Sequence, residues 1–232
     1  MLTNNDVKEL TVELFKQRSD RDKQHKVGAS NISNPCTRHL AHDLLGTPEA
    51  EMKYWMGGKI GTAIHSFLES AIEQSDSDVF DGCVVEEKIV LGEIPGYGVV
   101  SSKPDLVLPN SNHLIDWKTT SRAKVKKLQN LVDGIKEDAD SLYTIQKYVG
   151  QAQLYAWGLN QAGTKIDRST LVFINRDGTY ENDIWTYTFD YDESIALALW
   201  NRVTALWYDL QDGVHPDSYP NDPQCFKCSI GI

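Results

Sequence analysis

The sequence is poor in the features that mark secreted and membrane proteins. Its 232 residues include only four cysteines and no apolar run near the length of a membrane span, which needs about 20 residues. Residues 1–20 also lack the basic and then apolar order of a signal peptide. These absences predict a cytoplasmic protein with no membrane partner.

Basic residues are in deficit as well. Lysine and arginine number 23 against 33 aspartates and glutamates, which gives a formal net charge of −10. An acidic surface binds phosphate poorly, but an enzyme that holds a metal ion with carboxylates gains local positive charge from that ion. The one basic run contains Arg122, Lys124, Lys126 and Lys127. Its simplest alternative role is the solvated face of a helix.

Apolar residues make up 41% of the chain, which is enough for a hydrophobic core. Their spacing changes along the sequence between the helical period and the alternation of strands. The elements predicted from this spacing are helices over 5–18, 36–45 and 52–74, strands over 84–91, 97–108 and 113–118, helices over 124–135 and 143–159, strands over 169–175 and 183–189, and a helix over 192–210. This order predicts an α/β fold with a mixed sheet flanked by helices, formed by residues 1–232 as one domain.

Two acidic residues and a lysine form the most informative pattern. Asp116 and Lys118 are two apart on a predicted strand, so their side chains point to the same face. Trp117 points to the opposite face, toward packing. Asp105 lies near the end of the preceding predicted strand, and the turn between the strands brings it beside Asp116. Two carboxylates suit a hard cation such as Mg²⁺, and a lysine can orient a water or stabilise negative charge.

Other polar residues accompany this pattern on the predicted helices and strands. His65 follows Gly61 on the helix before the strands, and Gln151 lies one turn before Tyr155 on a later helix. Each of these taken alone is ordinary helix surface. The neighbouring Glu86 and Glu87, on an earlier strand, could add a carboxylate, and the spacing does not choose between them.

Taken together, these residues resemble a nuclease family. Pro104-Asp105 followed by Asp116-Trp117-Lys118 resembles the PD-(D/E)XK nuclease superfamily. The order G-x-x-x-H, D, D-x-K and Q-x-x-x-Y resembles its RecB-type branch, which includes the CRISPR-associated RecB-like exonucleases. The resemblance runs from about Cys36 to the C-terminus. One departure is Ser102, where the family often has glycine.

The resemblance implies a restriction-endonuclease-like fold and a DNA nuclease that depends on Mg²⁺ or Mn²⁺. By this resemblance His65, Asp105 and Asp116 bind the metal ion. Lys118 is the catalytic lysine, and Gln151 and Tyr155 position it or contact DNA. The expected activity is that of an exonuclease in recombination, repair or phage DNA processing, in the cytoplasm of a bacterium or of a phage-infected host. The alternatives are a structure-specific or nicking endonuclease, and a catalytically silent DNA-binding module. The oligomeric state is left open.

The cysteines predict a second metal site. In a cytosolic chain, metal ligation is a better use of cysteine than disulfide formation. Cys225-x-x-Cys228 has the spacing of a zinc knuckle, and Cys36-x-x-His39 repeats this spacing near the other end of the chain. Together these four residues could bind one structural zinc ion.

Such a site would join the N-terminal helices (1–50) to the C-terminal tail (213–232). RecB-like exonucleases can instead carry a 4Fe–4S cluster, held by one upstream cysteine and three near the C-terminus. Here the tail supplies only two cysteines, unless Cys83 contributes, and Cys83 reads better as a small buried apolar residue. We therefore expect zinc, with the iron–sulfur cluster as the alternative.

Overall fold

The strands form two separate sheets. The computed structural model describes residues 7–9, 12, 26–47, 55–179 and 183–229. The main sheet has five strands in the order β1-β4-β5-β6-β7, and β2 and β3 pair as a separate hairpin. The strands are β1 (Val84–Val85), β2 (Ile89–Ile94), β3 (Gly98–Ser102), β4 (Leu106–Leu108), β5 (His113–Thr120), β6 (Arg168–Asn175) and β7 (Ile184–Asp190).

The main sheet is mixed. β5 and β6 run parallel over their whole length, from the pair His113 and Arg168 to the pair Thr120 and Asn175. The other neighbours in this sheet are antiparallel. Parallel neighbours need a long crossover connection, and here α5 and α6 provide it. The predicted α/β class, a mixed sheet flanked by helices, is therefore confirmed.

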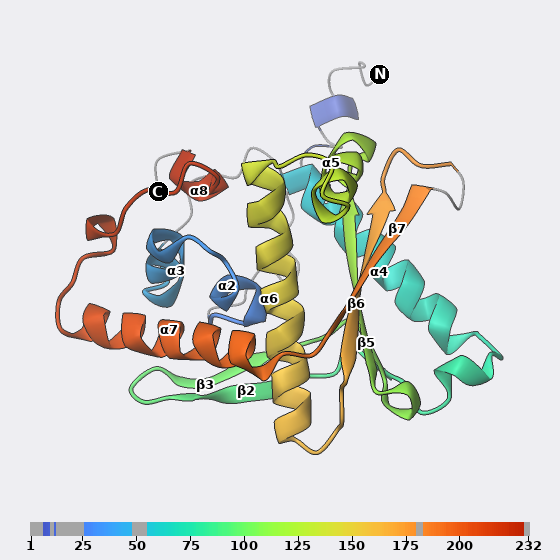
Figure 1. Ribbon diagram of the computed structural model, residues 1–232, viewed down its shortest axis with the longest axis horizontal. Coiled ribbons are helices and arrows are strands. Elements are labelled where there is room, and N and C mark those ends of the chain that lie inside the picture. Colours follow the sequence, from blue (N-terminus) through green and yellow to red (C-terminus); the bar gives the residue numbers. More distant parts are fainter. Residues whose placement is uncertain (1–6, 10–11, 13–25, 48–54, 180–182, 230–232) are drawn as a thin grey trace.

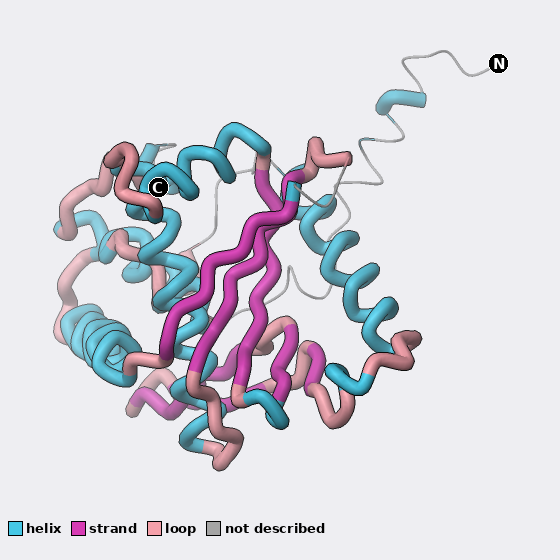
Figure 2. Tube along the Cα trace, turned by 45° about the vertical axis from the view of Figure 1, so that its right-hand side comes forward, coloured by secondary structure: helices cyan, strands magenta, loops and turns pink. Residues whose placement is uncertain are grey.

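Helices cover both faces of this sheet. They are α2 (Ala29–Ile32), α3 (Thr37–Leu44), α4 (Trp55–Glu73), α5 (Arg122–Val132), α6 (Ala139–Gln161), α7 (Glu193–Gln211) and α8 (Phe226–Ser229), with short 3₁₀ turns at η2 (Asp78–Phe80), η3 (Pro109–Ser111) and η5 (Pro216–Ser218). Figures 1 and 2 show α4 against one face and α6, with α2, α3 and α7 beyond it, on the other. None of the described helices combines the length and apolar character needed to cross a bilayer.

The two faces of the sheet bury different sets of apolar side chains. The larger core lies on the α6 side and contains Leu114, Leu154 and Phe173. A smaller cluster on the α4 side is built from Leu106, Leu108 and Trp117. The strand alternation that was expected to send Trp117 toward packing is confirmed.

Two of the predicted strands are wrong. The strand predicted over 84–91 is divided into β1 and β2, and that over 97–108 into β3 and β4, with each half in a different sheet. Glu86 breaks the first, because it adopts a positive φ of 50° where the chain leaves the main sheet. Pro104, which has no N–H for a strand ladder, lies between the halves of the second. Asp105 therefore lies just before β4 and not at the end of a strand.

The remaining predicted elements are confirmed, with boundary shifts of a few residues. The helix predicted over 5–18 falls largely outside the described residues, as does the start of the helix predicted over 52–74. The helix predicted over 36–45 is α3, and Cys36 is its N-cap, with the thiol accepting from the N–H of His39.

The contact between α6 and β2 depends on the absence of a side chain at Gly158. A Cβ atom there would lie 2.9 Å from Leu91 Cδ2 and 3.1 Å from the carbonyl oxygen of Val90. We predict that Gly158→Ala lowers the free energy of unfolding by about 1–3 kcal/mol, the usual range for overpacking. Gly58→Ala is the matched control, because Gly58 is also helical and no described atom lies within 4 Å of its Cβ position. The control should be neutral or stabilising by up to about 1 kcal/mol. Urea unfolding of both variants tests this, and equal effects would contradict it.

Candidate active site and metal centres

The central strand β5 carries a buried ion pair. Asp116 is 1% exposed, and its Oδ2 lies 2.6 Å from Lys118 Nζ. Apart from this ion pair, neither carboxylate oxygen of Asp116 has a hydrogen-bond partner among the described residues. Burial raises the pKa of Asp116 to about 6, although the charge of Lys118 opposes the shift. A buried carboxylate with unused acceptor capacity is unusual, and it is a feature expected where a cation binds.

Side chains of helix α6 contact Lys118. Lys118 Nζ donates to Gln151 Oε1 at 3.2 Å, and Gln151 Nε2 donates to the hydroxyl of Tyr155 at 2.7 Å. The ammonium also lies 4.9 Å from the centre of the Tyr148 ring. Burial would lower the pKa of Lys118, but the nearby carboxylates of Asp116 and Asp105 raise it above its usual value. Lys118 is therefore a charged group held in a fixed position.

The acidic residue before β4 is also tightly held. Asp105 Oδ2 accepts the backbone N–H of Trp117 at 2.7 Å, and Oδ1 lies 3.2 Å from His65 Nδ1. The His65 ring, which comes from α4, meets the ring of Trp117 edge to face. Burial favours the neutral form of Asp105, but the hydrogen bond from His65 and the charge of Lys118 hold its pKa below the usual value. The carboxylate is thus ionised and fixed on two sides.

Glu86 joins this group and completes a set of three ligand atoms. One atom each from His65, Glu86 and Asp105 lie within 4.8 Å of one another. Glu86 has the positive φ that is rare outside glycine and asparagine, and its N–H donates to the carbonyl of Asp105 at 3.2 Å. Glu87 is exposed. Strained backbone at a polar residue is often associated with a functional site.

The arrangement differs in one respect from the ligand set that the family resemblance implied. That set was His65, Asp105 and Asp116, whereas the compact cluster contains Glu86 as the third member. Asp116 lies close enough that the charge of Asp105 raises its pKa, but its carboxylate is engaged by Lys118. The spacing of the sequence had left Glu86 and Glu87 equivalent. The break in strand pairing after Val85 distinguishes them, and it is not visible in the residue pattern.

A second cluster joins the start of α3 to the C-terminal segment. One sulfur atom each from Cys36, Cys225 and Cys228 lie within 4.8 Å of one another, and Cys36 Sγ is 3.5 Å from Cys228 Sγ. His39 Nδ1 lies 3.2 Å from Cys225 Sγ. The hydrogen bond from Cys36 lowers the pKa of Cys225 to about 3, which favours a thiolate there. Cys83 lies elsewhere, against the smaller apolar cluster beside Trp117.

Polar contacts dock the C-terminal segment around this cluster. Lys227 Nζ donates to Asp43 Oδ1 at 2.7 Å, and His39 Nε2 lies 3.3 Å from Asp43 Oδ2. Arg38 and Asp217 form a further ion pair between α3 and η5. Burial opposes ionisation of Asp43, but its contacts with His39, Lys227 and Asn31 lower its pKa to about 2. The tail is therefore attached through charged groups, in addition to the cysteines.

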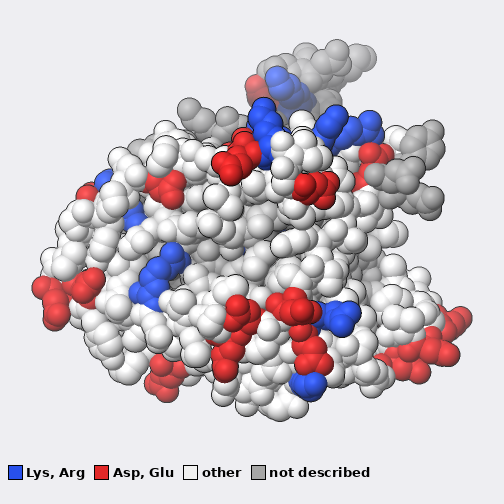
Figure 3. All heavy atoms as spheres, in the orientation of Figure 1, with Lys and Arg blue, Asp and Glu red and all other residues white. Residues whose placement is uncertain are grey.

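The basic run at the start of α5 is partly neutralised. Arg122 pairs with Asp183 at 2.8 Å, and Lys124 pairs with Asp140 at 2.6 Å. Lys126 is exposed on the same helix. In the space-filling view, basic side chains stand at the top, over α5 and beside acidic ones, while acidic side chains predominate along the lower rim (Figure 3). Further basic side chains lie at the centre-left of this face and among the acidic ones at its lower edge, so positive charge is not gathered into one patch here.

Comparison with known proteins identifies the fold. No family model matches the chain, and no curated protein matches it. A provisionally named exonuclease from Eubacterium rectale is similar over 100% of this chain and 94% of its own, with 12% identity and a TM-score of 0.53. An alkaline exonuclease from Laribacter hongkongensis has 16% identity and a TM-score of 0.49 over 81% and 89% of the two chains. A phage-related exonuclease from Haemophilus somnus has 17% identity and a TM-score of 0.44 over 84% and 88%.

Identities this low establish a shared fold and nothing further. The chain shares its fold with the E. rectale structure, and the predicted α/β fold, with a mixed sheet flanked by helices, is confirmed. What the chain does has to be argued from its own residues.

The His65–Asp105 pair predicts a pH dependence of stability in metal-free protein. Burial lowers the pKa of His65, but the Asp105 carboxylate raises it more. The contribution of His65 to stability is therefore present below about pH 6.5 and is lost as the pH rises through the raised pKa. The lowered pKa of Asp105 makes its contribution present above about pH 4 and lost as the pH falls. With a chelator present, we compare the free energy of unfolding of wild type with that of His65→Asn. The advantage of wild type should be larger at pH 6 than at pH 9, by on the order of 1 kcal/mol. Urea titrations at both pH values measure this, and a pH-independent difference would refute it.

Proposed function

We propose that the protein is a metal-dependent DNA nuclease that hydrolyses phosphodiester bonds. The observation that carries this proposal is the placement of a charged, fixed lysine next to a compact group of metal-ligand side chains. Lys118 is held by Asp116 and Gln151, and its charge acts on Asp105 of the cluster formed with His65 and Glu86. Carboxylates are suitable ligands for Mg²⁺ or Mn²⁺, and the imidazole of His65 would be an additional ligand.

The positions of these side chains support binding of such an ion. His65, Glu86 and Asp105 can approach one ion together, and Asp116 offers a buried oxygen without a hydrogen-bond partner in the described chain. When bound, a divalent ion polarises a phosphate and lowers the pKa of a water. The Trp117 N–H fixes Oδ2 of Asp105, and Oδ1, which lies 3.2 Å from His65 Nδ1, would be the oxygen that holds an ion.

The chain's own residues then supply orientation and charge. The Lys118 ammonium can stabilise the negative charge that develops on the phosphate, or orient the attacking water. Gln151 Oε1 accepts a hydrogen bond from this ammonium, and Gln151 Nε2 donates to the hydroxyl of Tyr155, which fixes the amide. Tyr155 therefore acts through Gln151 and positions the lysine from a distance.

We further propose that the enzyme is an exonuclease of recombination, repair or phage DNA processing, acting on cytoplasmic DNA. The fold shared with a structure named as an exonuclease supports this choice. A nicking endonuclease and a catalytically silent DNA-binding module are the alternatives. A silent module has no chemical need for Asp105, Asp116 and Lys118 together. Linear DNA and covalently closed circular DNA, each with and without Mg²⁺, separate the three possibilities.

Variants of the cluster test the nuclease directly. Asp105→Ala, Asp116→Ala and Glu86→Gln should each reduce Mg²⁺-supported cleavage of linear DNA at least ~10²-fold, because the loss of a metal ligand removes several kcal/mol of charge stabilisation. Glu87→Gln is the matched control, because Glu87 is the exposed neighbour with the same charge. Its rate should stay within about twofold of wild type. Near-normal cleavage by folded Asp116→Ala would falsify the assignment.

We also propose that the cysteine cluster binds one structural zinc ion. The Sγ atoms of a tetrahedral zinc site are about 3.8 Å apart, given a Zn–S distance of about 2.3 Å. The 3.5 Å between Cys36 and Cys228, and the spread of at most 4.8 Å among the three thiols, agree with a single ion. A 4Fe–4S cluster would hold its cysteines around a larger inorganic core. His39, beside Cys225, is the fourth ligand of the proposed site.

Purified protein should therefore contain about one zinc per chain, in addition to any nuclease metal. Cys225→Ser should lose this zinc and unfold at a lower temperature, because the bound ion contributes to folding stability. Cys83→Ser is the control, since Cys83 lies outside the cluster, and it should retain full zinc content. Brown protein with iron and sulfide would assign the iron–sulfur cluster instead. Absence of both metals, with Cys225→Ser as stable as wild type, would remove the site.

A further inference from the structure

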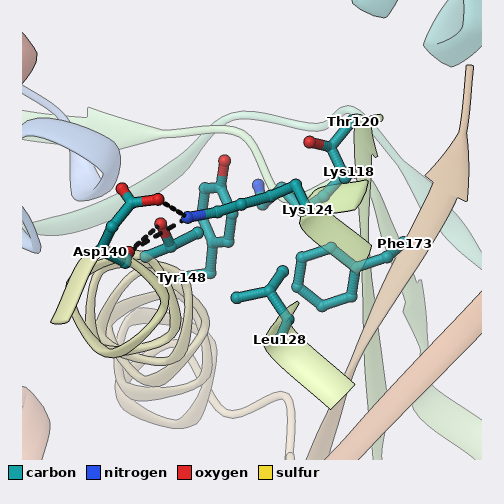
Figure 4. A pocket seen from close by; sticks show the side chains of 8 residues that line it. Lys118, Thr120, Lys124, Leu128, Asp140, Tyr148 and Phe173 are labelled. Atoms are coloured by element: carbon teal, nitrogen blue, oxygen red, sulfur yellow. Dashed lines mark hydrogen bonds and ion pairs between the residues drawn. The ribbon is translucent and has the colours of Figure 1, made fainter. Parts of the chain in front are cut away.

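A pocket of about 290 Å³ opens beside Lys118 (Figure 4). It lies where α5 and α6 begin, and its lining includes Lys118 itself. Ser121 and Asp138 cap the two helices, so both N-termini are well formed at this end of the molecule. The pocket shares Lys118 with the candidate active site, and most of its other lining residues have no role in the catalytic model.

The floor of the pocket is apolar and partly aromatic. Leu128 and Phe173 are fully buried beneath it, and the Tyr148 ring forms one wall. The half-buried Tyr148 ring is the flat surface that remains open to a ligand, and it suits the face of a base.

The rim of the pocket is polar and includes two cationic groups. Lys118 and Lys124 contribute ammonium groups, and Thr120 and Thr144 contribute hydroxyls. Among the described residues that line the pocket, Asp140 is the only acid. A ligand that fits this combination has an apolar, flat body and an anionic group, which is the chemistry of a nucleotide.

Lys124 and Asp140 connect the two helices across the rim. Lys124 Nζ lies 2.6 Å from Asp140 Oδ2 and donates to the Asp140 carbonyl at 3.1 Å. Figure 4 shows the Lys124 side chain extending from α5 to reach this acid at the start of α6. The Asp140 side chain is 53% exposed. Solvent-exposed ion pairs of this kind contribute little, so an incoming anion can replace the carboxylate at small cost.

We propose that this pocket binds one nucleotide of the DNA strand adjacent to the cleaved bond, and that its phosphate takes the place of Asp140 on Lys124. The proposal rests on the nuclease function, because it places this nucleotide next to Lys118. Lys124 is the phosphate-binding residue of the pocket. Asp140 competes with the phosphate for Lys124, and this competition weakens the affinity of the protein for DNA.

The test measures DNA binding without cleavage. Binding of a fluorescein-labelled single-stranded oligonucleotide is followed by anisotropy in chelator, over a range of salt concentrations. Lys124→Gln should raise the Kd about tenfold, as expected for the loss of one charge-assisted contact, and should reduce the salt slope by about one. Lys126→Gln removes the same charge from the same helix outside the pocket, and its Kd and slope should match wild type. Equal effects of the two variants would overturn the proposal.

Asp140→Asn separates competition from a purely structural role. If Asp140 competes with the phosphate, the variant binds the oligonucleotide several-fold more tightly and keeps its salt slope. If the ion pair only fastens α5 to α6, both Lys124→Gln and Asp140→Asn lower the melting temperature without this opposite effect on Kd, and the proposal fails. Cleavage assays on the same variants keep the two hypotheses apart. Wild-type protein that never cleaves DNA refutes the nuclease, whereas cleavage with a Kd unaffected by Lys124→Gln refutes the pocket alone.

Discussion

The ion pair between Asp116 and Lys118 is the interaction on which the rest of the structure depends. Both groups lie inside the protein, and burial of a charged pair can cost more solvation energy than the attraction between the charges returns. Such a pair is therefore weak evidence for a stabilising role. It needs a central strand to bury Asp116 between neighbours, and a helix above it to satisfy Lys118. The parallel pairing of β5 with β6 meets both needs, because its crossover connection contains α6.

Much of the architecture could be predicted from residue patterns in the sequence. Alternation along β5 separates Asp116 and Lys118 from Trp117, and the four-residue spacing of Gln151 and Tyr155 places both on one face of α6. These local rules hold because a strand or helix fixes side-chain direction over short distances. The same rules predicted most helices and strands and the mixed sheet. The approach of Cys36 and His39 to Cys228 and Cys225 was expected on different grounds, from the matching spacing of the two pairs, because local rules say nothing about residues this far apart in the sequence.

The failures have a common physical origin in the backbone. The apolar residues on both sides of Glu86 are compatible with one continuous strand, and alternation alone cannot show that the strand changes sheets. The positive φ at Glu86 and the proline at position 104 permit the chain to leave the main sheet and return. That excursion forms the β2–β3 hairpin, and it turns the Glu86 carboxylate toward Asp105. A tertiary pairing decides the outcome, and no local propensity records it.

The cysteine cluster has a consequence for the order in which the protein is made. Cys36 and Cys228 are separated by 192 positions, and Arg202 of α7 binds the carbonyls just before Cys36. Synthesis proceeds from the N-terminus, so every residue of the candidate nuclease site is translated before Cys228 exists. The central sheet can thus be assembled while the N-terminal helices still lack their final partner. Closure of the cluster is a late event, and a chain truncated before Cys225 would keep the candidate catalytic residues but never bring Cys36 together with Cys225 and Cys228.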